Sequence, residues 1–233
     1  MELKGSRPLV TGAARGIGRV FVEAFLTAGA ETVFAGVRNE EAAKRVAGIN
    51  PRVTPLIVDT TVPHQVDAAA SIADIDILVN NAGVLHYANF VGSDSLEAAR
   101  QEMEVNYFGP LAMARAFAPH LEARDGAIVN VLSVASLIYI PLVGSYNASK
   151  AAARSMTLGL RHELASRNVR VLAVYAGGYS TDMHPDPAVR ASLNHPSVLT
   201  DAVLDALRGD GPLDVFPDEM SQGAARSIGL LAA

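Results

Sequence analysis

A tyrosine and a lysine stand four residues apart in the segment Tyr146-Asn147-Ala148-Ser149-Lys150. On an α-helix this spacing places both side chains on one face. An isolated phenol has a pKa near 10, but a neighbouring ammonium favours the phenolate and lowers that pKa. A depression of ~2–3 units, worth about 3–4 kcal/mol, would make Tyr146 a usable acid or base near neutrality. Such pairs more often form a solvated helix face, so context must decide between the two interpretations.

A glycine-rich turn, Thr11-Gly12-Ala13-Ala14-Arg15-Gly16-Ile17-Gly18, separates an apolar stretch from a helical pattern. Glycine allows a ligand to approach the main chain closely. The helix that follows would offer free N–H groups and the positive end of its dipole to a pyrophosphate. The spacing differs from G-x-G-x-x-G, and a turn of this kind can also be only a tight strand-to-helix connection.

The charge at the end of the second predicted strand indicates which dinucleotide is bound. Sheets that bind NAD usually carry an acidic residue there, which contacts the ribose 2′-hydroxyl. Here Val37 is followed by Arg38, and the first acid is Glu40. Arg38 and Arg15 could bind the 2′-phosphate of NADP through charge-assisted hydrogen bonds, although either could also be a solvated surface arginine. The two together favour NADP.

The elements that would position these residues alternate along the chain. Apolar stretches predict strands at 8–10, 32–37, 53–58, 75–79, 127–132, 169–174 and 213–216. Helical patterns cover 20–28, 40–47, 63–72, 96–117, 146–165, 197–207 and 218–228, the fourth of them interrupted or shaped near Gly109-Pro110. This alternation predicts an α/β fold: a doubly wound, Rossmann-like parallel sheet with helices on both faces, in one domain over residues 1–233. The candidate residues follow strands, where such sheets bind ligands.

Composition excludes several other classes of function. Of the 233 residues half are apolar, the net charge is −5 and there is no basic run, so a nucleic-acid partner is not expected. The absence of cysteine excludes disulfides, thiolate metal sites and a thiol nucleophile. His86 and His184 have no partner at metal-ligand spacing, so no metal is expected. No apolar run reaches the ~20 residues of a membrane span and no signal peptide is evident, so a cytoplasmic protein without a membrane partner is expected.

The sequence resembles the short-chain dehydrogenase/reductase family over nearly its whole length. Four motifs occur in the family's order: Thr11-Gly12-x-x-x-Gly16-Ile17-Gly18, Asn80-Asn81-Ala82-Gly83, Ser133 and Tyr146-x-x-x-Lys150. Asn106, within Val105-Asn106-Tyr107-Phe108-Gly109, matches the family's catalytic asparagine. The resemblance implies an NADP(H)-dependent enzyme that interconverts a ketone or aldehyde and an alcohol.

The resemblance also implies a role for each catalytic candidate. Tyr146 would give a proton to the carbonyl oxygen or take one from the alcohol, and Lys150 would bind the nicotinamide ribose and keep the phenol acidic. Ser133 would hydrogen-bond the substrate oxygen as charge develops on it. Asn106 would hold a water that connects Lys150 to solvent. The hydride would come from the nicotinamide.

The expected cofactor contacts extend over several strand ends. Ala176 stands where the family usually has proline, which suggests a more mobile loop beside the nicotinamide, and Leu132 replaces a frequent second serine. The contacts implied by the resemblance and by the charge pattern are Thr11, Gly12, Arg15, Gly16, Ile17, Gly18, Arg38, Asp59, Thr60, Asn81, Ala82, Gly83, Tyr146, Lys150, Gly177, Tyr179 and Thr181.

Apolar and aromatic residues after three strands are candidate substrate-pocket walls, although such residues more often serve packing. They are Leu85, His86, Tyr87, Ile138, Tyr139, Ile140, Tyr179, Met183 and His184. Two other functions stay open: a catalytically silent NADP-binding sensor or scaffold, and a ketoreductase for carrier-bound acyl substrates. The resemblance further implies a homotetramer or homodimer.

Overall fold

The computed structural model describes residues 1–209 and 211–232, and in them the chain forms one seven-stranded sheet in the order β3-β2-β1-β4-β5-β6-β7. Every neighbouring pair of strands is parallel. The strands are β1 Pro8–Thr11, β2 Val33–Val37, β3 Val53–Ile57, β4 Ile77–Asn80, β5 Ala127–Val131, β6 Arg170–Val174 and β7 Asp214–Val215. The order reverses between β1 and β4, which opens a crevice at their carboxyl ends. The predicted doubly wound parallel sheet is confirmed.

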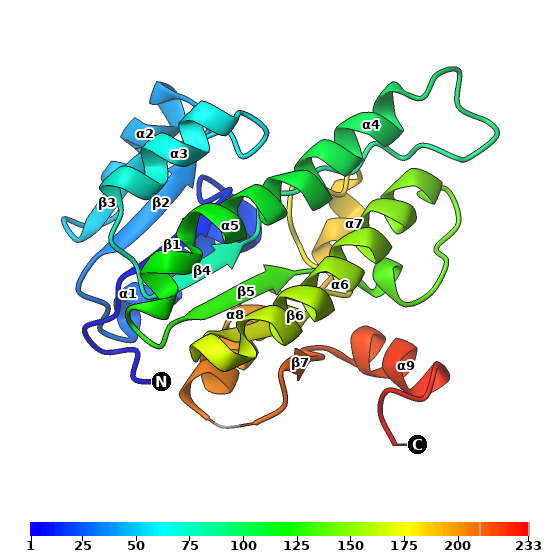
Figure 1. Cartoon of the computed structure of the whole chain (residues 1–233). Helices are drawn as coiled ribbons and strands as arrows, with labels where there is room; N and C mark the ends of the chain where they lie inside the picture. The colour runs from blue at the N-terminus through cyan, green and yellow to red at the C-terminus, as the bar shows by residue number, and fades with distance from the viewer. Residues whose placement is uncertain (210, 233) are drawn as a thin grey trace.

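Helices cover both faces of the sheet (Figure 1). One core cluster joins α1, α2 and α8 to the sheet, and a second joins α3, α5 and α6 to the opposite face. The helices are α1 Gly16–Thr27, α2 Glu40–Ala47, α3 Pro63–Ile72, α4 Glu97–Met103, η1 Glu104–Phe108, α5 Gly109–Glu122, η2 Val134–Ser136, α6 Gly144–Leu164, η3 Ala165–Arg167, α7 Pro187–Ser192, α8 Ser197–Arg208 and α9 Glu219–Ser227. Within residues 1–209 and 211–232, no helix is both long and apolar enough to cross a bilayer.

The central strands are buried along their whole length, because a parallel sheet has a helical layer on each side. Two polar residues interrupt this apolar interior. Asn80 of β4 lies opposite Asn130 of β5, and its amide donates to the Asn130 side-chain oxygen at 2.9 Å. The amide of Asn130 in turn donates to Thr157 of α6 at 2.9 Å. This chain of bonds fixes α6, which carries the tyrosine and the lysine, against the middle of the sheet.

Among the predicted helices and strands, the helix expected over residues 96–117 differs most from the structure. It consists of α4, the π-helical turn η1 and α5, which continues to Glu122. Pro110 has no N–H to donate, and the helix continues through it because the preceding turn is π-helical, with the Gly109 N–H donating to the Glu104 carbonyl. The short helices η2 and α7 were not predicted, because segments this short lack a readable period.

Candidate active site

The four predicted catalytic residues come together at the carboxyl ends of β4 and β5. Tyr146 lies in the first turn of α6 and Lys150 one turn later, while Ser133 follows β5 and Asn106 lies in η1. The Lys150 ammonium lies 5.8 Å from the centroid of the Tyr146 ring. A Cβ placed on Gly83 would meet Asn106 Oδ1 at 3.2 Å and Lys150 Nζ at 3.8 Å. The structure therefore places the two side chains of the Tyr-x-x-x-Lys motif on one face, beside the segment after β4.

Tyr146 is buried in a small apolar cluster with Ala135 and Val143, and the partly buried Leu85 and Ile140 pack against it. The Ser133 side chain lies next to the Tyr146 hydroxyl and, as a hydrogen-bonding group, lowers the pKa of the phenol. The Ser133 oxygen also accepts the Ala135 N–H at 3.1 Å, so this serine both caps η2 and contacts the phenol. Ser133 therefore has the turn-capping role that a strand-end hydroxyl often has and also lies beside the phenol; its predicted catalytic role stays a prediction.

The pKa of Tyr146 differs from the expected depression. Burial raises it to about 12, and the hydrogen bond from Ser133 only partly opposes this effect. Burial also lowers the pKa of Lys150 to about 8, and its ammonium donates to the Val131 carbonyl at 2.9 Å. The expected depression of the Tyr146 pKa is wrong for the polypeptide alone, because burial of the phenol raises this pKa.

Asn106 owes its position to the π-helical turn. Its side-chain oxygen accepts the Val84 N–H at 2.9 Å, and its amide donates to the Val84 carbonyl and to the Ser149 hydroxyl, both at 3.0 Å. Both amide hydrogens are thus used, and only the oxygen has capacity left for a further partner. Asn106 connects the segment after β4 to α6; its predicted water-holding role stays a prediction.

The glycine turn is closely packed against the end of β4. A Cβ on Gly18 would lie 2.3 Å from the Gly12 carbonyl oxygen, and Gly12 and Gly16 have φ of +66° and +54°. The Thr11 hydroxyl accepts the N–H groups of Asn81 and Ala82 at 3.0 Å each. Since no side chain caps α1, its first N–H groups are open to an anion. This turn fits the pyrophosphate of a dinucleotide.

At the adenosine side Arg38 and Arg15 are both exposed. Arg15 lies 3.7 Å from Asp182, but the two side chains are 71% and 58% exposed, so this weak ion pair leaves Arg15 able to exchange partners. The Asp59 carboxylate accepts the Thr61 N–H and hydroxyl at 3.0 and 2.7 Å, and so shapes the turn into α3. Its predicted adenine contact stays a prediction.

The family model described as short chain dehydrogenase matches residues 8–188. The chain belongs to the short-chain dehydrogenase/reductase family. The mouse dehydrogenase/reductase SDR family member 7B is 34% identical over 195 residues, 78% of this chain and 60% of that protein. Galactitol 2-dehydrogenase of Agrobacterium fabrum is 35% identical over 76% of this chain and 72% of its own length. Several of the curated relatives are therefore considerably longer than the segment they share with this chain.

Solved structures of the family agree with this fold. A short-chain dehydrogenase from Burkholderia cenocepacia in complex with NADP has 43% identity and a TM-score of 0.90, with 98% of this chain and 94% of that one covered. The 3-ketoacyl-(acyl-carrier-protein) reductase of Brucella melitensis, complexed with NADH, has 30% identity and a TM-score of 0.80. The match covers 87% of this chain and 90% of that one. One of these relatives thus binds NADP and the other NADH.

The loop after β6 is fastened to the C-terminal helix of this family member. Asp218, the N-cap of α9, accepts the Tyr179 hydroxyl at 2.6 Å and the Gly177 N–H at 3.0 Å. The Tyr179 ring is buried in the core, and burial beside Asp218 raises the pKa of its phenol. Thr181 lies beside Gly16 of the glycine turn. Asp218, which sequence reasoning missed, opposes the mobility expected from Ala176.

We predict that Asp218→Ala lowers the free energy of unfolding by about 3 kcal/mol, since it removes a helix cap and two hydrogen bonds to a buried carboxylate. It should also raise the KM for the nicotinamide cofactor several-fold. Urea denaturation and cofactor titration measure the two effects. Asp186→Ala is the matched control: Asp186 caps α7 through the Ala188 N–H but is exposed. Equal effects of the two substitutions would contradict the fastening of this loop by Asp218.

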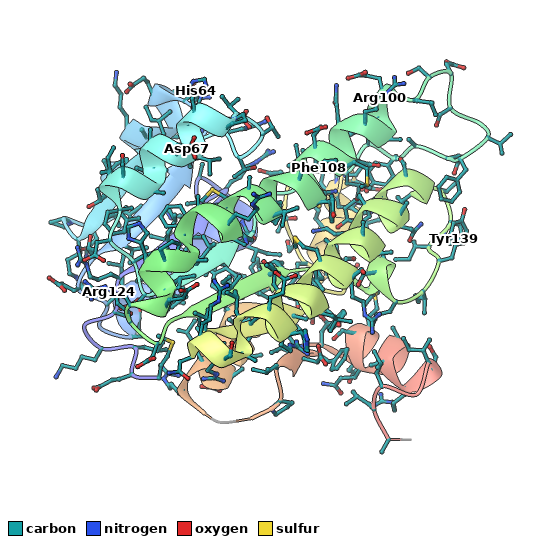
Figure 2. The ribbon with its side chains drawn as sticks, in the orientation of Figure 1. His64, Asp67, Arg100, Phe108, Arg124 and Tyr139 are labelled. Carbon is teal, nitrogen blue, oxygen red and sulfur yellow. The ribbon has the colours of Figure 1, made fainter. Side chains whose placement is uncertain are left out.

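Aromatic side chains from the segments after β4, η2 and β6 form two pairs. Phe90 and Tyr139 stack with ring centroids 6.4 Å apart, and the Tyr87 ring meets His184 edge-on at 6.5 Å. Figure 2 shows Tyr139 on the segment between η2 and α6, on the same side of the molecule as Arg100 of α4. Of the predicted pocket walls, Leu85 and Ile140 reach Tyr146, whereas Tyr139 lies on the rim with 60% of its surface exposed.

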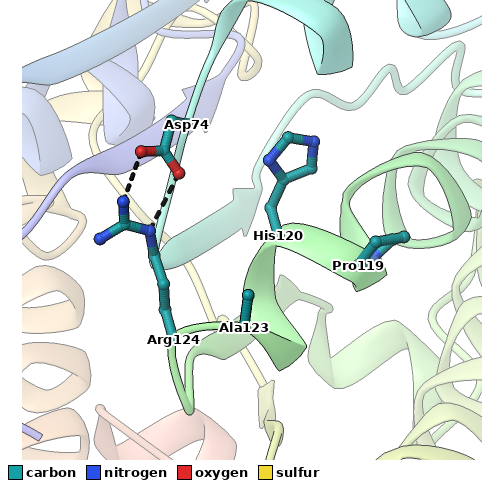
Figure 3. Close-up of a pocket in the computed structure, with 5 residues that line it drawn as sticks. All are labelled: Asp74, Pro119, His120, Ala123 and Arg124. Carbon is teal, nitrogen blue, oxygen red and sulfur yellow. Dashed lines mark hydrogen bonds and ion pairs between the residues drawn. The ribbon is translucent and has the colours of Figure 1, made fainter.

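A hollow of 510 Å³ lies away from the site, at the amino ends of the strands (Figure 3). It is lined by Asp74, Pro119, His120, Ala123 and Arg124, and Arg124 and Arg7 both pair with the Asp74 carboxylate. Asp74 precedes β4 and Arg124 precedes β5, so this cluster connects the segments that lead into the two strands. It has no contact with the predicted catalytic residues.

Proposed function

We propose that the chain is an NADP(H)-dependent oxidoreductase that interconverts a ketone or aldehyde and an alcohol, and that residues 1–233 work as a single cofactor-binding and catalytic unit. The observation that carries this proposal is the buried hydroxyl pair of Ser133 and Tyr146, with the Lys150 ammonium beside the phenol ring. The pair lies at the carboxyl ends of the strands, next to a glycine turn that fits a pyrophosphate.

In the direction of reduction, the Tyr146 hydroxyl donates its proton to the substrate oxygen. Ser133 hydrogen-bonds the same oxygen and stabilises the negative charge that develops on it. Lys150, whose pKa of about 8 allows it to change protonation near neutrality, can return a proton toward the phenol. The apolar cluster around the phenol excludes water. The nicotinamide, when bound, supplies or accepts the hydride.

The cofactor would lie across the crevice between β1 and β4. The glycine turn and the first turn of α1 would hold the pyrophosphate, the backbone of Ala82 and Gly83 the adenosine side, and Lys150 the nicotinamide ribose. Preference for NADP over NAD is supported by exposed Arg38 directly after β2, where no acid stands. The Burkholderia cenocepacia relative in complex with NADP also supports it.

We predict that Arg38→Ala raises the KM for NADPH about 10- to 100-fold, the value of a lost charge-assisted hydrogen bond of about 1.5–3 kcal/mol, and leaves the KM for NADH within about twofold. Initial rates with each cofactor at a fixed ketone concentration measure the effect. Arg45→Ala, an exposed arginine on the neighbouring helix α2 that pairs with Glu41, is the matched control. An equal rise in the KM for NADPH and in the KM for NADH would show that Arg38 does not bind the 2′-phosphate.

The proposed activity is tested by following NADPH absorbance with a panel of ketones and aldehydes, with NADH run in parallel. Turnover of at least one carbonyl compound is expected. Tight NADPH binding without turnover of any substrate would favour the sensor or scaffold. An acyl-pantetheine ketone belongs in the panel because the Brucella melitensis relative is a 3-ketoacyl-(acyl-carrier-protein) reductase. Cytoplasmic location and a homodimeric or homotetrameric state remain predictions from the sequence.

A further inference from the structure

A glutamate with no exposed surface lies beside the catalytic tyrosine. Glu102, in the last turn of α4, is 0% exposed. One of its carboxylate oxygens accepts the His86 N–H at 2.8 Å, and the other accepts the Ser145 hydroxyl at 2.5 Å. Glu102 thus connects three elements: α4, the segment after β4 and the first turn of α6. Ser145 directly precedes Tyr146.

The side chain acts here as an acceptor at both oxygens. In the part of the chain that the structure describes, no lysine, arginine or histidine lies within ion-pair distance of it. Burial of a carboxylate without a counter-ion is unfavourable unless hydrogen bonds compensate for the lost hydration. A buried ionisable group of this kind in an active-site wall is a candidate for a functional role.

The geometry gives Glu102 two means of acting on Tyr146. The first is mechanical: the Ser145 N–H and hydroxyl also reach the Ala88 carbonyl at 3.3 and 3.5 Å, so the start of α6 is fixed on both sides. The second is electrostatic, because a negative charge nearby disfavours the phenolate and raises the pKa of Tyr146.

Other groups around the phenol differ from Glu102 either in the direction in which they shift the Tyr146 pKa or in the solvent exposure of their side chains. Tyr87 adds to the rise in the pKa of Tyr146, and Ser133 lowers it. The side chains of His86 and Glu104 are exposed to solvent, which screens charge there. The titratable groups closest in sequence to the contacts of Glu102 are His86 and Tyr87 after β4, Glu104 and Tyr107 in η1, and Tyr146 and Lys150 in α6. The same helices also carry Glu97 and Arg100 in α4 and Arg154, Arg161, His162 and Glu163 farther along α6.

We propose that Glu102 is a positioning residue whose buried carboxylate fixes the first turn of α6 and, through its negative charge, keeps Tyr146 as a proton-donating phenol. The proposal rests on the proposed function, in which Tyr146 is the acid of carbonyl reduction and, ionised, the base of alcohol oxidation. Glu102 thereby favours the reductive form of the site at neutral pH.

The test is Glu102→Gln, which keeps the shape of the side chain but removes its charge. The amide oxygen can still accept the His86 N–H, and the amide NH2 can donate to the Ser145 hydroxyl oxygen, so that the second bond is kept with its direction reversed. We expect the acid limb of kcat/KM for alcohol oxidation, at saturating NADP, to move about 0.5–1 pH unit lower, since the phenolate forms more easily. The plateau of kcat should change little. Glu104→Gln, the same change at an exposed position two residues away, should leave the profile where it is. A Glu102→Gln profile that superimposes on the wild type overturns the electrostatic part of the proposal.

Glu102→Ala tests the mechanical role of Glu102 separately from its electrostatic role. It removes the bonds to His86 and Ser145 and should lower kcat about tenfold at every pH, whereas Glu102→Gln restores the plateau. Equal kcat in the alanine variant and the wild type would overturn the positioning role.

A substrate-free measurement distinguishes failure of this proposal from failure of the proposed function. In protein labelled with ¹³C at the tyrosine ring, the resonance that Tyr146→Phe removes identifies Tyr146. In an alkaline titration this resonance should begin to shift at lower pH in Glu102→Gln than in the wild type. An unchanged onset argues against Glu102 even when no substrate of the enzyme has been found.

Discussion

Tyr146→Phe is expected to lower kcat for carbonyl reduction about 10³-fold, within the 10²- to 10⁴-fold range of general acid–base catalysis. The substitution removes the only atom of the ring that can donate a proton to the substrate. The ring itself stays in its apolar cluster with Ala135 and Val143, so the site keeps its shape. The loss should therefore fall on kcat, with the dissociation constant of NADPH within about threefold of the wild type. Steady-state NADPH oxidation and cofactor fluorescence measure the two quantities.

Tyr139→Phe provides the control, because Tyr139 is 60% exposed on the rim of the same site. Its loss of a hydroxyl should leave kcat nearly unchanged, and any contribution of this candidate pocket wall to substrate binding should appear only in the KM for the substrate. If Tyr146→Phe retained more than a tenth of the wild-type kcat, the proton would have to come from another group and the proposed mechanism would be wrong.

Lys150→Met is expected to abolish turnover and yet to stabilise the protein without cofactor at pH 7. Burial lowers the pKa of Lys150 from 10.5 to about 8, which corresponds to about 3 kcal/mol of unfavourable free energy for the buried ammonium. Loss of its hydrogen bond to the Val131 carbonyl offsets about 1 kcal/mol of this gain. A net increase of about 1–2 kcal/mol in the free energy of unfolding follows. Calorimetry and urea denaturation measure it.

The pH dependence of this stabilisation has a definite sign. Because the pKa of Lys150 is lower in the folded state, the unfolded chain binds more protons between about pH 8 and 10.5, and the wild type gains stability as pH rises through that range. The advantage of Lys150→Met should therefore be largest below pH 8 and shrink toward pH 10. Lys44→Met, at an exposed position in α2, should show neither effect. A constant difference across this range would show that the lysine charge is not the cause.

The sequence predicted the sheet well because its signals are local. Buried strands such as Ala127–Val131 are apolar throughout, and Tyr146 and Lys150 lie on one helix, so their juxtaposition depends only on helical spacing. The position of Asn106 was less predictable: the π-helical turn that aims it arises from packing between α4, α5 and α6, whereas the sequence showed only an irregularity near Pro110.

Long-range polar contacts could not be predicted. Asp218 lies 41 residues beyond Gly177, and Glu102 lies 43 residues before Ser145, so no short pattern connects either pair. One sequence signal could have identified Glu102 as a candidate functional residue: it is an acidic residue at an inward position of a helix whose other charged residues are exposed. The pKa of Tyr146 was predicted with the wrong sign for a related reason, since burial is a property of the fold and not of a four-residue motif.

The fastening of the loop after β6 has a consequence for how this enzyme can evolve or be engineered. A Cβ at position 177 would lie 2.3 Å from a carboxylate oxygen of Asp218, so the two positions constrain each other. A larger residue at 177 becomes tolerable only after Asp218 has changed, and once it is in place the return to aspartate is blocked. Mutational libraries that vary the loop after β6 one position at a time will miss variants with a larger residue at 177. Paired randomisation of positions 177 and 218 will reach them.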